Sequence, residues 1–178
     1  LVRAGAVVID SPDIYDGFAF VPHRNGKASQ WLPEACRGLV KLKSTKRTSP
    51  TIDALCVHVG VITDATPKFL LDAADAVSVE LLASLAREVG AKYVFAGNWH
   101  DRRIRYVSEA GEVLRTKDLD GRKDRDDLVS VFQLGALVPT GFDNPGVEGY
   151  GTLAIFEPDV VFDSAVKWEE MRGPRFVL

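Results

Sequence analysis

The chain has 178 residues, of which 46% are hydrophobic and 26% are charged, and its formal net charge is -3 at pH 7. These values match those of ordinary globular domains, so they exclude a largely disordered chain. The acidic balance also gives no overall field that would attract nucleic acid or an anionic membrane. We therefore expect one globular domain over residues 1–178. No apolar run reaches the roughly 18–20 residues that a membrane span needs, and the start of the chain lacks a signal-peptide pattern, so we expect a cytoplasmic protein.

The first fifty residues predict two strands and a helix. Residues 3–10 and 17–22 are short apolar runs that stop at aspartate or proline, which is typical of strands, with "SPDIYDG" as the turn between them. Residues 32–43 predict a short helix that carries Pro33 in its first turn. A basic patch lies at the end of this helix and in the turn-rich stretch after it, and we interpret it as solvated; it is formed by Lys41, Lys43, Lys46 and Arg47.

The central part of the chain predicts a β-α-β unit. Residues 53–62 place apolar side chains on both faces of an extended run, which indicates a strand that is covered on both sides. Residues 68–90 carry apolar side chains at helical spacing and end at Gly90, a common residue at a helix C-terminus. Residues 92–97 form a second apolar run. A strand, a long helix and another strand in this order favour parallel pairing of the two strands.

The second half of the chain predicts mainly antiparallel structure. A β-hairpin is expected over residues 103–108 and 112–119, with Gly111 in its turn. Residues 128–138 fit either a helix or a strand. The last expected elements are a strand over residues 152–156 and a closing helix over 163–172. The whole pattern predicts an α/β or α+β fold with a mixed sheet, a central β-α-β unit and a more antiparallel C-terminal half.

The stretch "KYVFAGNWHDRRIRYV" places a dense polar cluster directly after an apolar run. In open α/β sheets, polar groups at the carboxyl end of a strand face the crevice where ligands usually bind. His100 has the chemistry of a general base or metal ligand, and Asp101 is suited to orient it. Arg102 and Arg103 are suited to hold an anion. The alternative is an exposed corner with ordinary ion pairs.

A second pattern consists of three aspartates at expected strand ends, Asp10, Asp64 and Asp101. Carboxylates that converge at one edge of a sheet hold Mg²⁺ in many enzymes that act on phosphate esters. In such an enzyme His100 would serve as the acid/base. The same aspartates also suit turns and helix caps, so the sequence leaves both interpretations open.

The remaining motifs indicate no cofactor. Neither nucleotide-binding glycine motif occurs, and Cys36 and Cys56 do not form a close pair of the kind that binds zinc. These two cysteines form either one disulfide or two reduced thiols. The glycine-rich residues 139–151 contain Phe142 and Tyr150, which either form a recognition loop or fold back onto the core.

Because no catalytic motif is present, the sequence favours a small interaction module without catalysis of its own, such as an inhibitor, an immunity-type protein or an accessory subunit. Its expected partner is another protein. The predicted contact residues, with Trp99, Arg102 and Arg103 as anchors, are Asn98, Trp99, His100, Arg102, Arg103, Phe142 and Tyr150. One alternative is a metal-dependent hydrolase or nuclease for a phosphate ester, built from Asp10, Asp64, His100 and Asp101. Another is a small-molecule binding domain with its pocket at the strand ends.

Overall fold

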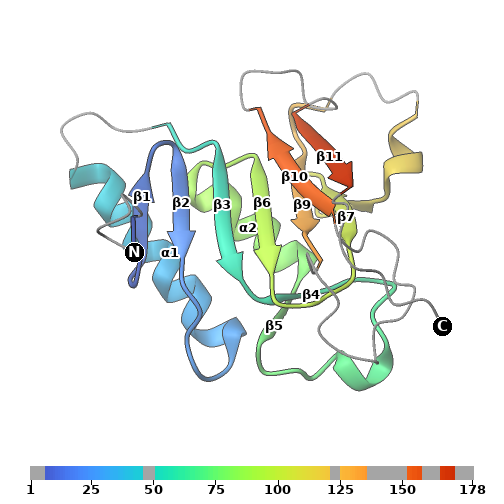
Figure 1. Ribbon diagram of the computed structural model, residues 1–178, viewed down its shortest axis with the longest axis horizontal. Helices are drawn as coiled ribbons and strands as arrows, with labels where there is room; N and C mark the ends of the chain where they lie inside the picture. Colours follow the sequence, from blue (N-terminus) through green and yellow to red (C-terminus); the bar gives the residue numbers. More distant parts are fainter. Residues whose placement is uncertain (1–6, 46–50, 121–124, 136–151, 158–164, 171–178) are drawn as a thin grey trace.

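The computed structural model describes residues 7–45, 51–120, 125–135, 152–157 and 165–170 (Figure 1). These residues form a seven-stranded sheet, two separate two-stranded sheets and two α-helices. The predicted class, a mixed α/β fold, is confirmed. Among the described residues, no helix is both long enough and apolar enough to cross a membrane.

The large sheet has parallel strands in its centre and antiparallel strands at its edges. Its strand order is β1-β2-β3-β6-β9-β7-β8. The four strands β2, β3, β6 and β9 run parallel to one another, while β1, β7 and β8 pair with their neighbours in antiparallel fashion. The bounds are β1 (Asp13–Tyr15), β2 (Phe18–Val21), β3 (Ala54–His58), β6 (Tyr93–Gly97), β7 (Arg103–Val107), β8 (Val113–Leu114) and β9 (Val129–Gln133).

The first hairpin differs from the prediction. Residues 7–10 are irregular, so the strand expected over residues 3–10 is wrong for the part that the structure describes. Strand β1 forms instead within the expected turn. Asp16 and Gly17, with φ of 49° and 79°, make the two-residue turn that joins β1 to β2. The Asp-Gly pair is a strong signal for such a hairpin, because both turn residues need positive φ.

The central unit is a parallel β-α-β arrangement with two corrections. The strand expected over residues 53–62 is broken at Val59: β3 belongs to the large sheet, whereas β4 (Gly60–Ile62) pairs in parallel with β5 (Ala76–Ser78). The helix expected over residues 68–90 is α2 (Val79–Val89), which Ser78 caps by accepting a hydrogen bond from the Leu81 N–H. The residues before β5 form only the single 3-10 turn η2 (Lys68–Leu70).

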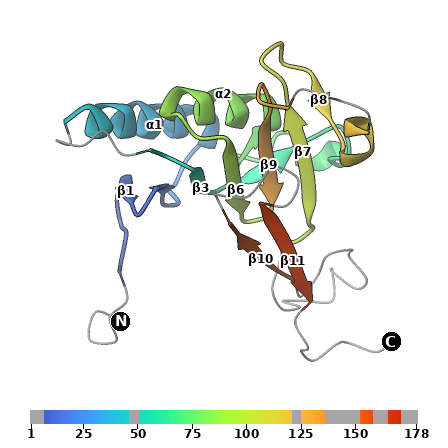
Figure 2. The ribbon, with the colours of Figure 1, turned by 90° about the horizontal axis from the view of Figure 1, so that it is seen from above.

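The helices and the C-terminal strands cover opposite faces of the large sheet, as Figure 2 shows. Helices α1 (Ala28–Thr45) and α2 pack on one face, over side chains such as Leu55 and Val94. On the other face, β10 (Thr152–Phe156) and β11 (Val166–Glu170) form an antiparallel ribbon over an aromatic cluster. Helix α1 extends beyond the predicted residues 32–43 at both ends.

The C-terminal elements are strands. Strand β9 settles the ambiguity over residues 128–138 in favour of a strand, within the described residues. The helix predicted over residues 163–172 is wrong, because β11 occupies its centre. Its side chains alternate: Val166 and Trp168 pack against the aromatic cluster, while Lys167 and Glu169 are exposed. This period of two is the spacing of a strand with one buried face. The hairpin β7–β8, with Gly111 at φ 82°, confirms the predicted turn. Its second strand is shorter than the predicted residues 112–119, because β8 covers only Val113–Leu114 and Thr116–Leu119 form the 3-10 turn η3.

Candidate functional site

The carboxyl ends of the parallel strands meet at one edge of the large sheet. Val21, Val57, Ala96 and Gln133 lie side by side in the strand register, and Arg103 of β7 pairs with Gln133. The residues that follow these strand ends therefore share one edge of the molecule. Ligands of open α/β sheets usually bind there, so this edge is the candidate site.

Two residues of the predicted polar cluster, Asp101 and Arg103, form one hydrogen-bonded network with Gln133 of β9. The Arg103 guanidinium forms an ion pair with the Asp101 carboxylate. The buried Gln133 amide donates to the Asp101 carbonyl at 2.7 Å and to its carboxylate at 2.8 Å. Its own carbonyl oxygen accepts from the Val61 N–H at 3.0 Å, which ties β4 to the edge of the large sheet. Asp101 is thus held in place by Arg103 and Gln133.

The same cluster fastens both ends of the segment that joins β4 to β5, residues 63–75. At its start, Arg103 donates to the hydroxyls of Thr63 and Thr66 at 3.2 and 3.1 Å. At its end, Asn98 donates to the Asp75 carboxylate at 2.5 Å. We call these contacts the clamp. The clamp therefore holds both ends of the 63–75 segment against the edge of the large sheet.

The other residues of the cluster also have partners within the chain. The Trp99 ring lies against Gly60, where an added Cβ would come within 2.3 Å of the ring. The Arg102 guanidinium lies 4.8 Å from the ring centre of Trp168 on β11, a cation-π contact. His100 is half-buried. The predicted contact residues Phe142 and Tyr150 lie outside the described residues.

Asp64 lies at the start of the 63–75 segment and binds two arginines. Its carboxylate accepts two hydrogen bonds from Arg105, at 2.8 and 3.0 Å, and forms an ion pair with Arg115. The hydrogen bonds from Arg115 and then Arg105 lower the pKa of Asp64 to about 2. The carboxylate therefore stays ionised, and its oxygens are occupied by guanidinium groups.

The carboxylates predicted as a magnesium site do not converge. Asp10 precedes β1, at the edge of the sheet remote from β7. β1 and β7 lie five strand positions apart, about 24 Å at the usual strand spacing. Asp64 and Asp101 each bind a different arginine of β7. Among the described residues there is no group of three or more histidine, cysteine, aspartate or glutamate side chains suited to a metal ion.

The cysteines are separate thiols. Cys36 is buried in α1 and Cys56 is half-buried in β3, and neither forms a disulfide. Burial raises the pKa of Cys56 to about 11, and burial together with the charge of Glu88 raises the pKa of Cys36 to about 12. Both thiols are therefore protonated at neutral pH and unsuited to nucleophilic attack.

Two histidines at this edge were not among the predicted site residues. His58 is the last residue of β3, and His23 follows the end of β2. Their ring centres lie 5.7 Å apart with the ring planes at 90°, and both side chains are exposed. The His23 ring also packs edge-on against the buried Trp31 of α1. The signal that identifies these histidines is their position at or shortly after the ends of parallel strands.

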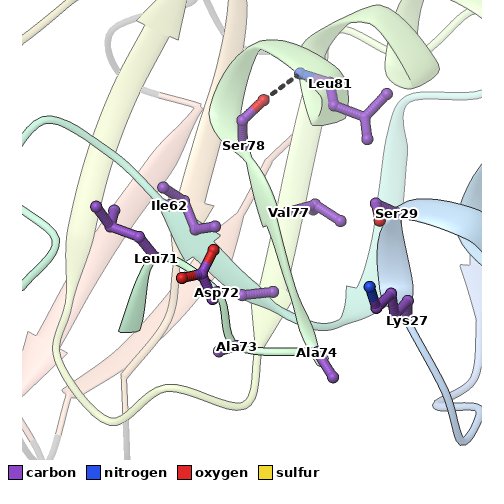
Figure 3. A pocket seen from close by; sticks show the side chains of 11 residues that line it. Lys27, Ser29, Ile62, Leu71, Asp72, Ala73, Ala74, Val77, Ser78 and Leu81 are labelled. Atoms are coloured by element: carbon purple, nitrogen blue, oxygen red, sulfur yellow. Dashed lines mark hydrogen bonds between the residues drawn. The ribbon is translucent and has the colours of Figure 1, made fainter. Parts of the chain in front are cut away.

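A pocket of about 360 Å³ lies beside the 63–75 segment (Figure 3). Its walls are mainly apolar and include Ile62, Val77 and Leu81. Lys27 and Asp72 lie on opposite sides of the pocket in Figure 3. The segment itself displays unburied apolar side chains next to this pocket.

Phe69 and Leu71 are the large apolar side chains of the segment that are exposed to solvent. Phe69 of η2 is 83% exposed, and Leu71, which also lines the pocket, is 44% exposed. The helical spacing of apolar residues predicted that both lie in a helix over residues 68–90. The structure instead presents them to solvent between the two ends of the clamp.

The fold and this edge define a mixed α/β protein in which the ends of parallel strands support an exposed apolar segment. Comparisons with protein-family models, with curated proteins and with solved structures found no match.

Proposed function

We propose that the protein is an interaction module that binds another protein through the 63–75 segment and the adjoining pocket. The observation that carries this proposal is the 83% exposure of Phe69. Phenylalanine is usually buried, and full burial of its side chain is worth about 1.5–3 kcal/mol relative to exposure. A partner that covers this ring recovers that free energy.

The surroundings of Phe69 support a docking surface rather than a stray apolar residue. Leu71 lies two residues further on and leads into the pocket, whose walls include Ile62 and Val77. Lys27 and Asp72 provide charge on two sides of this apolar area. An apolar centre with a polar rim is the usual anatomy of a protein interface.

The clamp supports the proposal because it reduces the cost of binding. Arg103 and Asn98 hold the two ends of the segment, and the Ala28 N–H donates to the Ala74 carbonyl at 2.7 Å. A segment that is already positioned loses less conformational freedom when a partner binds it. In this proposal Asn98 and Arg103 act mainly by positioning the segment. Trp99, His100 and Arg102 remain predicted contacts at its side.

A small-molecule binding domain is the second candidate, and the pocket favours it. Its volume of about 360 Å³ lies within the usual range for ligand sites. The pocket is separable from Phe69 by mutation, because Phe69 is not among its lining residues. A small ligand held in the pocket alone would not require the Phe69 ring.

The test is affinity purification from the native source with three forms of the tagged chain: wild type, Phe69→Asp and Tyr15→Asp. Tyr15 is the matched control, since it is another exposed aromatic residue, at 51%, and lies on the edge strand β1. We expect a stoichiometric protein partner with the wild type and with Tyr15→Asp, and at least a tenfold loss with Phe69→Asp. Circular dichroism checks that all three forms are folded. Equal recovery with Phe69→Asp would overturn the proposal.

A further inference from the structure

We propose that His23 and His58 form a binding site for a divalent transition-metal ion of the Cu²⁺, Ni²⁺ or Zn²⁺ type. The site is separate from the proposed docking surface and does not depend on it. Imidazole nitrogen is the ligand that these ions share, and Mg²⁺ does not favour it. The inference rests on the distance between the rings and on the way the structure holds each ring.

The distance between the rings matches that of two imidazoles on one ion. A ring nitrogen binds such an ion at about 2.0–2.1 Å, and the ring centre lies about 1.1 Å further on, so two rings that share an ion have centres about 5–6 Å apart. The observed separation between His23 and His58 is 5.7 Å. Both side chains are exposed, so an ion reaches them from solvent without any opening of the fold.

Each histidine is held by a rigid neighbour. His58 pairs in register with Gly97 of β6, where an added Cβ would lie 3.2 Å from the His58 Nδ1 atom. The absence of a side chain at Gly97 thus leaves the space that the His58 ring uses. On the other side, the His23 ring packs against Trp31, which helix α1 holds in the core. Rings that packing positions in advance bind a metal more tightly than freely rotating ones.

Two histidines leave coordination positions of the ion free for a water or an anion from solvent. The pair therefore defines an open site rather than a closed structural one.

The experiment is a calorimetric titration of the full chain with Cu²⁺, Zn²⁺ and Mg²⁺ salts, each alone. We expect binding of one Cu²⁺ and weaker binding of Zn²⁺, in line with the usual order of affinities, and no binding of Mg²⁺. His23→Gln and His58→Gln should each weaken Cu²⁺ binding at least tenfold. His100→Gln is the matched control, because it removes the remaining histidine of the chain, and it should bind Cu²⁺ like the wild type.

A second readout counts the ligands. Electron paramagnetic resonance of the Cu²⁺-loaded wild type should report two imidazole nitrogens, and one in either single variant. Equal Cu²⁺ affinity in the wild type and in both His23→Gln and His58→Gln would overturn the proposal, as would an equal loss in His100→Gln. Phe69→Asp should leave Cu²⁺ binding unchanged. The proposed metal site and the proposed docking surface are therefore tested independently of each other. Circular dichroism verifies that each variant is folded.

Discussion

At the scale of single residues, Gly60 is required by its contact with Trp99. An alanine Cβ at this position would lie 2.3 Å from the Trp99 ring, a distance that non-bonded carbon atoms do not adopt. Gly60 is also buried, so the ring or the strand must shift to admit a methyl group. We predict that Gly60→Ala lowers the free energy of unfolding by about 1–3 kcal/mol, the usual cost of overpacking. Urea denaturation measures this change.

Gly38 provides the matched control for Gly60. It lies in the exposed face of α1, and an added Cβ there meets nothing within 4 Å. Gly38→Ala should therefore raise the free energy of unfolding by about 0.5–1 kcal/mol, because alanine is the better helix former. If the Trp99 contact is the cause, the loss from Gly60→Ala should be smaller when Trp99→Ala is already present. If Gly60→Ala lowers the free energy of unfolding equally with and without Trp99→Ala, a contact other than that with Trp99 is responsible.

At the scale of elements, Asp64 joins the 63–75 segment to the hairpin β7–β8 through Arg105 and Arg115. Its pKa is lowered to about 2 in the folded chain from an ordinary value of 3.8. The contribution of these ion pairs to the free energy of unfolding is therefore present above pH 4 and is lost as the pH falls toward 2. The side chain is 45% exposed, and solvent screening limits the contribution to about 1 kcal/mol or less.

The prediction for Asp64 concerns the difference between two pH profiles. The wild type should be more stable than Asp64→Asn at pH 5–7, and this difference should shrink toward zero between pH 4 and pH 2. Thermal unfolding across this pH range measures it. Asp10→Asn is the control, since the Asp10 carboxylate accepts a hydrogen bond only from a neutral group, the exposed Ser11 hydroxyl, among the contacts described. A constant difference across the range for Asp64→Asn would contradict the role of the ion pairs.

The sequence predicts elements well where the signal is local. The Asp-Gly turn of the first hairpin, the capped end of α2 at Gly90 and the hairpin β7–β8 all follow from neighbouring residues. The helix expected over residues 68–90 is shorter because residues 76–78 pair with β4. This contact joins two strands that the 63–75 segment separates along the chain, so local helical spacing does not reveal it. Phe69 and Leu71 satisfy helical spacing, and spacing alone cannot reveal that no surface covers them.

The site was predictable only in part for the same reason. The polar residues that follow β6 are evident in the sequence, but their partners are not. Gln133 meets Asp101 from 32 positions away, and Arg103 meets Thr63 from 40 positions away. His23 and His58 come together because the ends of β2 and β3 are adjacent in the sheet. Strand order, which the sequence does not specify, decides these contacts.

At the scale of the whole molecule, the large sheet lies between two helices on one face and the ribbon β10–β11 on the other. Helices α1 and α2 form one continuous core with the sheet and with each other. The ribbon β10–β11 is a separate two-stranded sheet, and the described contacts with the large sheet are made by side chains such as Phe156 and Trp168. A two-stranded ribbon is only marginally stable by itself. Its order therefore depends on the aromatic side chains that attach it.

Phe156 is the main attachment point. Its ring centre lies 4.8 Å from that of Tyr93, 5.2 Å from Phe95 and 5.8 Å from Phe18, all of which belong to the large sheet. We predict that Phe156→Ala releases the ribbon, at a cost of about 1–3 kcal/mol for a half-buried ring, while the sheet and both helices remain folded. Hydrogen exchange should then show loss of protection in β10 and β11 and retained protection in β3 and β6.

Ile155→Ala is the control, because Ile155 precedes Phe156 on β10 but is 37% exposed on the outer face of the ribbon. This variant should leave exchange in β10 and β11 close to that of the wild type. Comparison of Phe156→Ala with Ile155→Ala thus tests which face of β10 attaches the ribbon to the large sheet. If Phe156→Ala instead accelerates exchange in β3 and β6 as much as in β10, the ribbon and the sheet unfold as one cooperative unit. That outcome would support the predicted single domain over residues 1–178, and it would contradict the proposal that the ribbon can detach while the large sheet stays folded.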